Sequence, residues 1–353
     1  MDLNNVERMK ELDPENMIDH INRLPEQLFS AWQLGQTLDL PDWEGIDNIL
    51  ISGMGGSAIG ADLLATYVRP FCSVTITVHR DYQLPAWANN DRTLVICSSH
   101  SGNTEEVLTV LEDVLKTDRK VMGISTGGKL SEKAKTASFP LWLFEHNFQP
   151  RTAVGFSFGL LLAIFFRLGL IPDPSSDLKE TIEEMKKQQT DLLPDVPDTS
   201  NPSKRLAGQL MGRWITFWGA ESMAPIARRW KGQINENAKV QASFEILPEA
   251  DHNALQGIMQ PEAQFGATMN IFLLSKDNHP RNKIRSEFTR MTFMLEGQNT
   301  DFYKAKGKSR LAQMWTTIHF GDYVSYYLAI GYGVDPSPVP MLVELKEKMK
   351  DAK

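Results

Sequence analysis

The sequence predicts an α/β protein of two domains, each a mostly parallel sheet flanked by helices in an α-β-α sandwich. Short β-branched runs alternate with helical patterns along most of the chain, which is typical of βαβ units. A proline-rich stretch, Pro194 to Pro202, interrupts this alternation. The alternation then restarts with the same pattern of strand, glycine turn and hydroxyl residue. This weak internal repeat is compatible with two copies of one fold.

In the first half, strands and helices are expected to alternate after a helical N-terminal arm at 1–45. The expected strands are Ile49–Ile51, Val74–Val78, Thr93–Cys97, Val121–Ile124 and Phe139–Phe144. The expected helices are Ser57–Val68, Glu105–Lys116, Leu130–Ala137 and an apolar, buried helix at Phe156–Leu170. These elements predict a first domain at 46–171.

A connecting helix and linker are expected at 172–204, where apolar side chains recur at steps of three and four behind a Ser176 cap. The second domain is expected at 205–353. Its expected strands are Trp214–Trp218, Ser243–Leu247 and Asn270–Leu274. Its expected helices are Met223–Ala238, Asn282–Leu295, Leu311–Ile330 and a last helix that ends the chain. The turn Gly219–Ser222 repeats the pattern of Gly53–Ser57.

Composition excludes several classes of protein. The 353 residues suffice for two domains, and the net charge of −7 argues against nucleic-acid binding, which requires a basic face. The N-terminus is acidic and polar, unlike a signal peptide. The longest apolar run is shorter than the ~20 residues of a membrane span and contains Arg167. Cys72 and Cys97 lie outside any CxxC spacing, so we expect core thiols and a cytoplasmic protein without a membrane partner.

Two loops that follow strands carry the residue types of anion sites. In Gly53–Ala58, glycines allow a sharp turn, and the helix that follows offers unpaired N–H groups. The string also satisfies GxGxxA, so a dinucleotide site, with His79 and Arg80 near a 2′-phosphate, is an alternative, as is a purely structural turn. In Ser98–Thr104, several hydroxyls bracket one glycine at a helix start. A cap needs one hydroxyl, and a dinucleotide site has no use for a second such loop, so a phosphate monoester is favoured.

These strings resemble those of a known family. GMGGSAIG and SSHSGNT are similar to the glycine loop and the SYSGNT-type signature of sugar isomerase (SIS) domains. Pro150-Arg151, NENAK at 235–239, His252-Asn253 and GVDPSP at 333–338 follow in the order found in bifunctional phosphoglucose/phosphomannose isomerases. The resemblance covers about 50 to 350. It implies two SIS-type domains and an isomerase, without a cofactor, that interconverts glucose 6-phosphate and mannose 6-phosphate with fructose 6-phosphate through a cis-enediol.

The resemblance also implies the roles of single residues. Glu236 would move a proton between C1 and C2, and His252 would open the sugar ring. Arg151 would stabilise the enediolate, and Lys346 would assist at the ring oxygen. The phosphate would be bound by Gly55, Gly56, Ser57, Ser99, Ser101 and Thr104. Taken without the family, Glu236 fits a solvated partner of Lys239, His252 a loop histidine and Arg151 a surface arginine.

The family further implies a homodimer with shared active sites, in which His252 reaches the neighbouring subunit's site. A set of aromatic side chains within Leu311–Ile330 fits such an interface or an intradomain core: Trp315, Phe320, Tyr323, Tyr326 and Tyr327. No metal is expected, because the histidines show no HxH or HExxH spacing. Ser337 is a candidate for the small hydroxyl residue linked to mannose tolerance. Another SIS-fold sugar isomerase and a non-catalytic SIS module that binds a sugar phosphate stay open as alternatives.

Overall fold

The computed structural model describes residues 2–117 and 119–351, and these fall into two compact units. Unit 1 comprises the described residues of 1–22, 185–306 and 314–353, and unit 2 those of 23–184 together with 307–313. Each unit is therefore assembled from separate stretches of the chain. Within the described residues, no helix has the length and apolar character that a membrane crossing requires.

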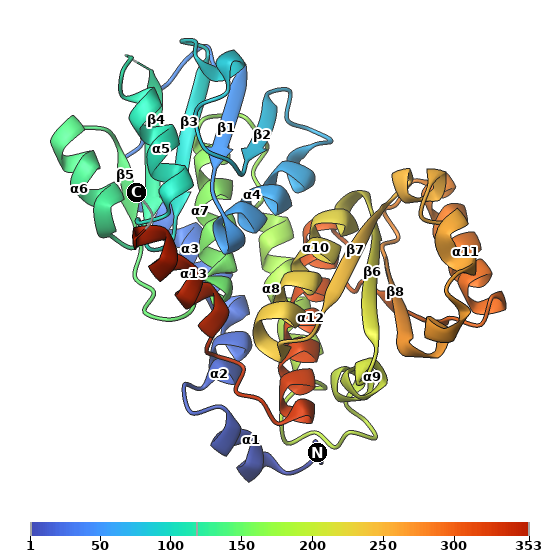
Figure 1. The fold of residues 1–353 in the computed structure, drawn as a ribbon. Coiled ribbons are helices and arrows are strands. Elements are labelled where there is room, and N and C mark those ends of the chain that lie inside the picture. Colours follow the sequence, from blue (N-terminus) through green and yellow to red (C-terminus); the bar gives the residue numbers. More distant parts are fainter. Residues whose placement is uncertain (1, 118, 352–353) are drawn as a thin grey trace. The chain divides into compact units, whose positions relative to one another are not determined.

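Unit 2 is built on a parallel sheet with the strand order β2-β1-β3-β4-β5 (Figure 1). Its strands are β1 Asn48–Ser52, β2 Thr75–His79, β3 Thr93–Ser99, β4 Lys120–Ser125 and β5 Leu141–Leu143. Its helices are α3 Leu24–Thr37, α4 Gly55–Val68, α5 Glu105–Val114, α6 Gly128–Ala137, α7 Val154–Arg167 and most of α8 Ser175–Gln189. Helices α5 and α6 cover one face of the sheet, and α4 packs on β1, β2 and β3 and on α7.

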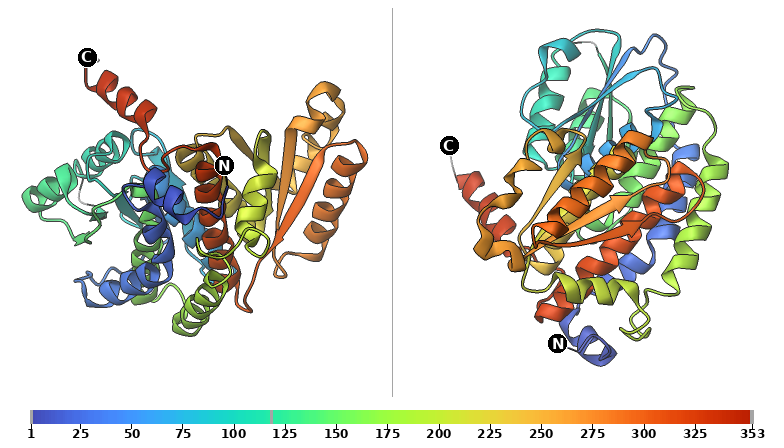
Figure 2. Two further views of the ribbon diagram at one scale, coloured as in Figure 1. Left: turned by 90° about the horizontal axis from the view of Figure 1, so that it is seen from below. Right: turned by 90° about the vertical axis from the view of Figure 1, so that its right-hand side faces the viewer.

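Unit 1 contains a second parallel sheet, with the order β7-β6-β8-β9. Its strands are β6 Trp214–Ala220, β7 Ala242–Leu247, β8 Thr268–Leu274 and β9 Asn299–Lys304. Its helices are α1 Val6–Leu12, α2 Met17–Asn22, α9 Pro202–Leu210, α10 Ala224–Gln233, α11 Pro280–Leu295, most of α12 Arg310–Tyr332, and α13 Pro340–Asp351. Figure 2 shows α11 on one face of this sheet, where Phe293 packs against Trp218 and Phe272.

The aromatic side chains of α12 lie in the core of unit 1. The ring of Phe320 stacks on Tyr303 of β9, with ring centroids 4.3 Å apart. The hydroxyl of Tyr323 donates to Asn22, and that of Tyr327 donates to the carbonyl of Leu192. Of the two interpretations of this aromatic stripe, the contacts support the intradomain core.

Most predicted strands and helices are confirmed within a few residues, but four details differ. Ser176 lies inside α8 and is not its cap, since the Asp173 carboxylate accepts from the Ser175 amide at 2.9 Å. The helix expected at Met223–Ala238 is α-helical only to Gln233 and ends in a π-turn, η4 (Ile234–Ala238). Helix α9 and strand β9 were not predicted from the sequence.

Candidate active site

Two loops of unit 2 meet at the carboxyl edge of its sheet. Strands β1 and β3 are parallel neighbours, so the residues that follow them lie side by side. A Cβ atom on Gly53 would lie only 3.1 Å from the carbonyl oxygen of Ser98, so the two loops are in contact. In this strand order the chain passes from β1 to β2 on one side and from β3 to β4 on the other. Folds of this kind bind their ligands between the two strands where the direction changes, here β1 and β3.

The loop 98–104 presents its hydroxyls at the start of α5. The hydroxyl oxygens of Ser99 and Thr104 lie 2.8 Å apart, and Thr104, at the N-cap position, makes no capping hydrogen bond to the helix. Ser101 is exposed, and its hydroxyl accepts from the Asn103 amide at 3.2 Å. Gly102 has a φ of +67°, and a Cβ there would lie 1.8 Å from the carbonyl oxygen of Gly127. Glycine is therefore required for this turn.

A third loop, Ser125–Gly128, follows β4 at the same edge and was missed by the sequence analysis. The amide of Thr126 donates to the carbonyl of His100 at 3.0 Å, and its hydroxyl donates to the same carbonyl at 2.7 Å. This loop therefore supports the hydroxyl loop 98–104 from the neighbouring strand. Its signal in the sequence is a glycine pair separated from a buried strand by one or two residues, as at Gly55 and Gly56.

Arg151 lies on the short turn η2 (Pro150–Thr152), which packs on the start of α4. A Cβ atom on Gly56 would lie 2.7 Å from the carbonyl oxygen of Pro150, so this glycine lets the arginine turn approach the first loop closely. Arg151 is 4% exposed, and its guanidinium donates to the side chain of Gln149 at 3.4 Å. The structure thus places a buried cation beside the glycine loop.

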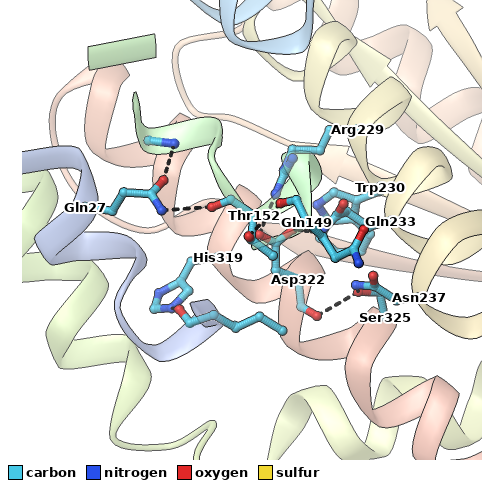
Figure 3. Close-up of polar contacts among 12 residues, drawn as sticks. Gln27, Gln149, Thr152, Arg229, Trp230, Gln233, Asn237, His319, Asp322 and Ser325 are labelled. Atoms are coloured by element: carbon cyan, nitrogen blue, oxygen red, sulfur yellow. Dashed lines mark hydrogen bonds and ion pairs between the residues drawn. The ribbon is translucent and has the colours of Figure 1, made fainter. Parts of the chain in front are cut away.

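A histidine pair connects the hydroxyl loop to the arginine turn. The His100 and His146 rings share a hydrogen bond of 2.9 Å, and the second ring nitrogen of His146 lies 3.2 Å from the Thr152 hydroxyl. The carbonyl of Thr152 in turn accepts from Gln27 of α3 at 2.9 Å (Figure 3). Burial lowers the pKa of His100, so the neutral ring is favoured.

Glu236 lies in the middle of η4 in unit 1, half-buried. The neighbouring residues of the NENAK string hold this π-turn. Asn235 donates to the Val240 carbonyl at 2.7 Å, and Asn237 donates to the Ser325 hydroxyl at 2.9 Å. Lys239 ends the turn with a φ of 58°, and its ammonium donates to the Asn237 carbonyl at 3.0 Å. π-Turns are rare in proteins as a whole, but those that occur are often at functional sites. This one fixes the backbone on both sides of a carboxylate.

A buried polar network joins α10 and η4 to α12. The Asp322 carboxylate accepts from Arg229 at 2.7 Å and from Gln233 at 3.0 Å (Figure 3). Arg229, Gln233 and Asn237 follow one another at steps of four, so they share one face of the helix. All three contact α12, which fixes the segment that carries Glu236 against a buried helix.

Predicted His252 is exposed on a separate segment, η5 (Glu249–His252). Its neighbour Asp251 accepts from the Thr289 hydroxyl at 2.8 Å and from Arg285 at 3.1 Å, both on α11. Glu236 precedes strand β7 and His252 follows it, and the six residues of β7 span about 17 Å. Within one chain, these two residues therefore lie on segments that flank opposite ends of the strand.

Comparison with known proteins gives the family. A family model described as bacterial phospho-glucose isomerase C-terminal SIS domain matches residues 199–349. A bifunctional phosphoglucose/phosphomannose isomerase of Caldicellulosiruptor bescii is 39% identical over 341 residues, which cover 96% of this chain and 100% of the relative. The chain belongs to this isomerase family.

A second relative agrees with the family assignment, and a solved structure shares the fold. A bifunctional phosphoglucose/phosphomannose isomerase of Aquifex aeolicus is 34% identical over 314 residues, covering 88% of this chain and 92% of the relative. The crystal structure of a hypothetical protein from Thermus thermophilus has a TM-score of 0.74 at 16% identity, covering 98% of this chain and 94% of that one, and shows a shared fold. The predicted α/β fold with two SIS-type domains is confirmed.

The remaining residues expected from the family lie in two further places. Lys346 is exposed on α13. Ser337, the candidate linked to mannose tolerance, is fully buried just before α13, where its amide donates to Asp335 at 2.8 Å. The structure thus groups Arg151 with the three loops of unit 2, whereas Glu236, His252 and Lys346 lie on three separate segments of unit 1.

The turn after the first strand of unit 1 repeats that of unit 2 but carries different side chains. A Cβ atom on Gly219 would lie 2.4 Å from the Met223 carbonyl oxygen, so the glycine again permits a tight turn after the first strand. The next side chains differ from those of unit 2, because Ser222 is 1% exposed and the Glu221 carboxylate accepts from the His279 amide at 3.0 Å. The acid at this turn is bound to the start of α11.

The dinucleotide alternative finds no support at Arg80. Its guanidinium pairs with Asp62 and donates to the Ala58 carbonyl at 3.2 Å, both on α4. A cofactor 2′-phosphate would have to compete with that carboxylate.

Proposed function

We propose that this protein interconverts glucose 6-phosphate and mannose 6-phosphate with fructose 6-phosphate. The match that carries the proposal is the 39% identity over the full length of a relative named for both activities. The hydroxyl-bearing loops of unit 2, with Arg151 beside them, suit a phosphorylated sugar anion. The two cysteines are unpaired, which agrees with a reducing cytoplasm as the place of this activity.

The substrate phosphate is bound at the starts of α4 and α5. Backbone N–H groups of Gly55 and Gly56 and the hydroxyls of Ser57, Ser99, Ser101 and Thr104 are the proposed donors. These contacts hold the sugar equally in the ground state and the transition state, so they contribute mainly to binding. Arg151 supplies a fixed positive charge to the enediolate as its negative charge develops.

Glu236 is the proposed base. It removes the proton from C2 of the open-chain aldose, which gives a cis-enediol, and returns a proton to C1, which gives the ketose. His252 transfers the proton that opens the sugar ring, and Lys346 assists at the ring oxygen. The network that holds η4 keeps the Glu236 backbone in one position during both proton transfers.

We further propose a homodimer with shared active sites. The support is that Glu236 precedes β7 and His252 follows it, and that the strand between their two segments spans about 17 Å. Two groups that act on one hexose must lie closer than that. A His252 contributed by a second subunit meets this requirement.

The test of the activity is a coupled assay that follows fructose 6-phosphate formed from each aldose phosphate, with and without EDTA. We expect both substrates to react and EDTA to leave both rates unchanged, because general acid–base chemistry here needs no metal. A requirement for zinc, or turnover of neither substrate, would contradict the proposal.

The test of the shared site is a mixing experiment. Glu236→Gln and His252→Ala homodimers should each be nearly inactive. In a randomly reassorted mixture about half the dimers are mixed, and each of these has one site with both lesions and one intact site. Activity should therefore return to about a quarter of that of the wild type. A mixture that contains mixed dimers but stays inactive would show that His252 acts in its own chain.

A further inference from the structure

Helix α11 exposes an apolar stripe along its whole length. Ile284 is 61% exposed, Phe288 61%, Met291 44% and Leu295 78%. Their spacing of four, three and four residues places them on one face of the helix, in the pattern of a helix–helix seam. Four large apolar side chains in one row on a surface mark an interaction site.

The stripe is not needed to fix α11 on its own sheet. The opposite face of the helix carries Ser286, Thr289 and Phe293, which are buried, and Phe293 packs on Trp218 of β6. The helix therefore has an inner face that unit 1 covers and an outer face that unit 1 leaves exposed (Figure 2).

The spacing of the stripe fits a second copy of this chain as the occupant. The steps of four, three and four residues between the stripe positions are the same from the N-terminal and from the C-terminal end of the helix. An antiparallel second copy related by a two-fold axis therefore matches Phe288 with Met291 and Ile284 with Leu295, each twice. A symmetric dimer needs this self-complementarity, because the same patch serves both subunits.

Charges at the two ends of α11 favour the same arrangement. The first turn carries basic Arg281 and Lys283, and acidic Glu296 stands at the C-terminal end. Each of these signs is opposite to the one that the helix's own dipole favours at that end, and at the amino end the Glu221 carboxylate of the same unit offsets part of the basic charge. An antiparallel partner reverses this, because its C-terminal end then lies beside the basic turn and its N-terminal end beside Glu296.

We propose that α11 is the contact through which two copies of this chain associate, as an antiparallel helix pair about a two-fold axis. Through Arg285 and Thr289 the helix also holds Asp251, the neighbour of His252. Association through α11 would therefore bring the His252 segments of both copies near the interface. This last step rests on the proposed function, whereas the pairing of α11 does not.

The first experiment compares Phe288→Glu with the wild type by sedimentation velocity and light scattering across a dilution series. We expect the dimer dissociation constant to rise ~100-fold or more, because two buried carboxylates replace the central apolar contact. Phe29→Glu is the matched control, since Phe29 is a 47% exposed phenylalanine on helix α3 of unit 2. It should stay dimeric. A Phe288→Glu protein that associates as tightly as the wild type, or a wild type that is monomeric throughout, overturns the proposal.

A second pair of variants tests the register and excludes misfolding as the explanation. Ile284→Lys and Leu295→Glu each place two charges against apolar side chains in a homodimer, so each alone should be monomeric. In a mixed dimer, one of these pairs joins opposite charges and the other is the native apolar pair. The mixture should therefore associate more tightly than either variant. No gain on mixing overturns the antiparallel register.

Activity distinguishes this inference from the shared active site. If Phe288→Glu is monomeric and inactive, and recovers turnover at high protein concentration, both proposals are supported. If it is monomeric and fully active, α11 is the interface and the shared site is wrong. If it is dimeric with reduced activity, the α11 interface is wrong and the shared site stands.

Discussion

The amino ends of α5 and α11 occupy equivalent places in the two units, but they are satisfied differently. Each helix follows the strand that neighbours the first strand of its sheet, β3 beside β1 and β8 beside β6. The start of α5 is bordered by the hydroxyl loop, and Thr104 makes no capping bond. At the start of α11, His279 caps the Arg281 amide, and Glu221 accepts from the His279 amide and, at 2.6 Å, from the Asn282 side chain.

The difference teaches that the negative partner favoured at a helix start does not have to be a ligand. Unit 1 takes this partner from its own chain, so the position is filled before any substrate arrives. In unit 2 the corresponding position is bordered by the hydroxyl loop, and its two acids, Glu105 and Glu106, belong to the first turn of α5 itself. The proposed function accordingly assigns phosphate binding to the loops of unit 2 and the base to Glu236 of unit 1, a division of roles within one repeated fold.

The largest expected effect concerns the base in unit 1. Glu236→Gln keeps the shape of the side chain but removes its basicity, so turnover should fall by ~10²-fold or more while KM stays close to that of the wild type. The control is Glu245→Gln, which changes another half-buried carboxylate of unit 1, on β7, and should keep turnover. Steady-state kinetics with both aldose phosphates measure this. Near-normal turnover of Glu236→Gln would remove unit 1 from the proton transfer.

The second effect concerns phosphate binding in unit 2. Ser101→Ala or Thr104→Ala should raise KM by about tenfold with little change in kcat, because one hydrogen bond to a charged group contributes about 1.5–3 kcal/mol in both states. Thr109→Ala on α5 is the matched control, since its hydroxyl bonds only to the Glu105 carbonyl within the helix. Initial rates over a range of substrate concentrations measure this. A fall in kcat at constant KM would mean that these hydroxyls act in the chemical step.

The third effect tests whether Glu221 is an internal partner of α11. Glu221→Ala should lower the free energy of unfolding by about 1 kcal/mol, as loss of a helix cap does, and leave KM unchanged. Glu221→Gln keeps an acceptor oxygen and should lose less. Chemical denaturation and steady-state kinetics of both variants measure this. A raised KM for either substrate would show that unit 1 also contacts the phosphate.

The smallest effect is a pH dependence of stability in unit 2. Burial lowers the pKa of His100 below its ordinary value of 6.5, so the unfolded chain binds a proton more readily than the folded one. This histidine's contribution to stability is complete above pH ~6.5 and decreases as the pH falls below it. Thermal unfolding of the wild type and His100→Asn between about pH 5 and pH 7.5 measures this, and the variant should show the shallower dependence. Identical slopes would exclude His100 as the source.

Much of the fold could be predicted from local patterns. The central strands of unit 2, β1, β3 and β4, were predicted because they are buried on both faces and therefore read as short apolar runs such as Leu94–Cys97. Strand β9 was missed because its sequence, NTDFYK, is mostly polar, as the last strand of a sheet can be. Helix α9 was missed because its Asn201 cap and first-turn Pro202 read as the end of a linker.

The candidate site, like the fold, has one part that the sequence predicted and one part that it did not. The loops of unit 2 follow strands that are neighbours in the sheet, so their composition was enough to predict an anion site. The surroundings of Glu236 depend on contacts distant in sequence, such as Asn237 with Ser325, 88 residues later. The π-turn itself has no known sequence signal of its own. Only the family resemblance singled out Glu236, because its residue type and spacing equally fit a solvated glutamate.

The π-turn also makes the site sensitive to chain length. Its hydrogen bonds close over five residues, so η4 holds one residue more than a regular helical turn would. Deleting any single residue of 234–238 would restore the α-helical register and rotate the rest of the segment by about 100°. Substitutions around Glu236 can be tolerated one at a time, whereas a single-codon deletion would redirect the carboxylate. Among functional descendants of this sequence, we expect this stretch to keep Glu236 and its number of residues.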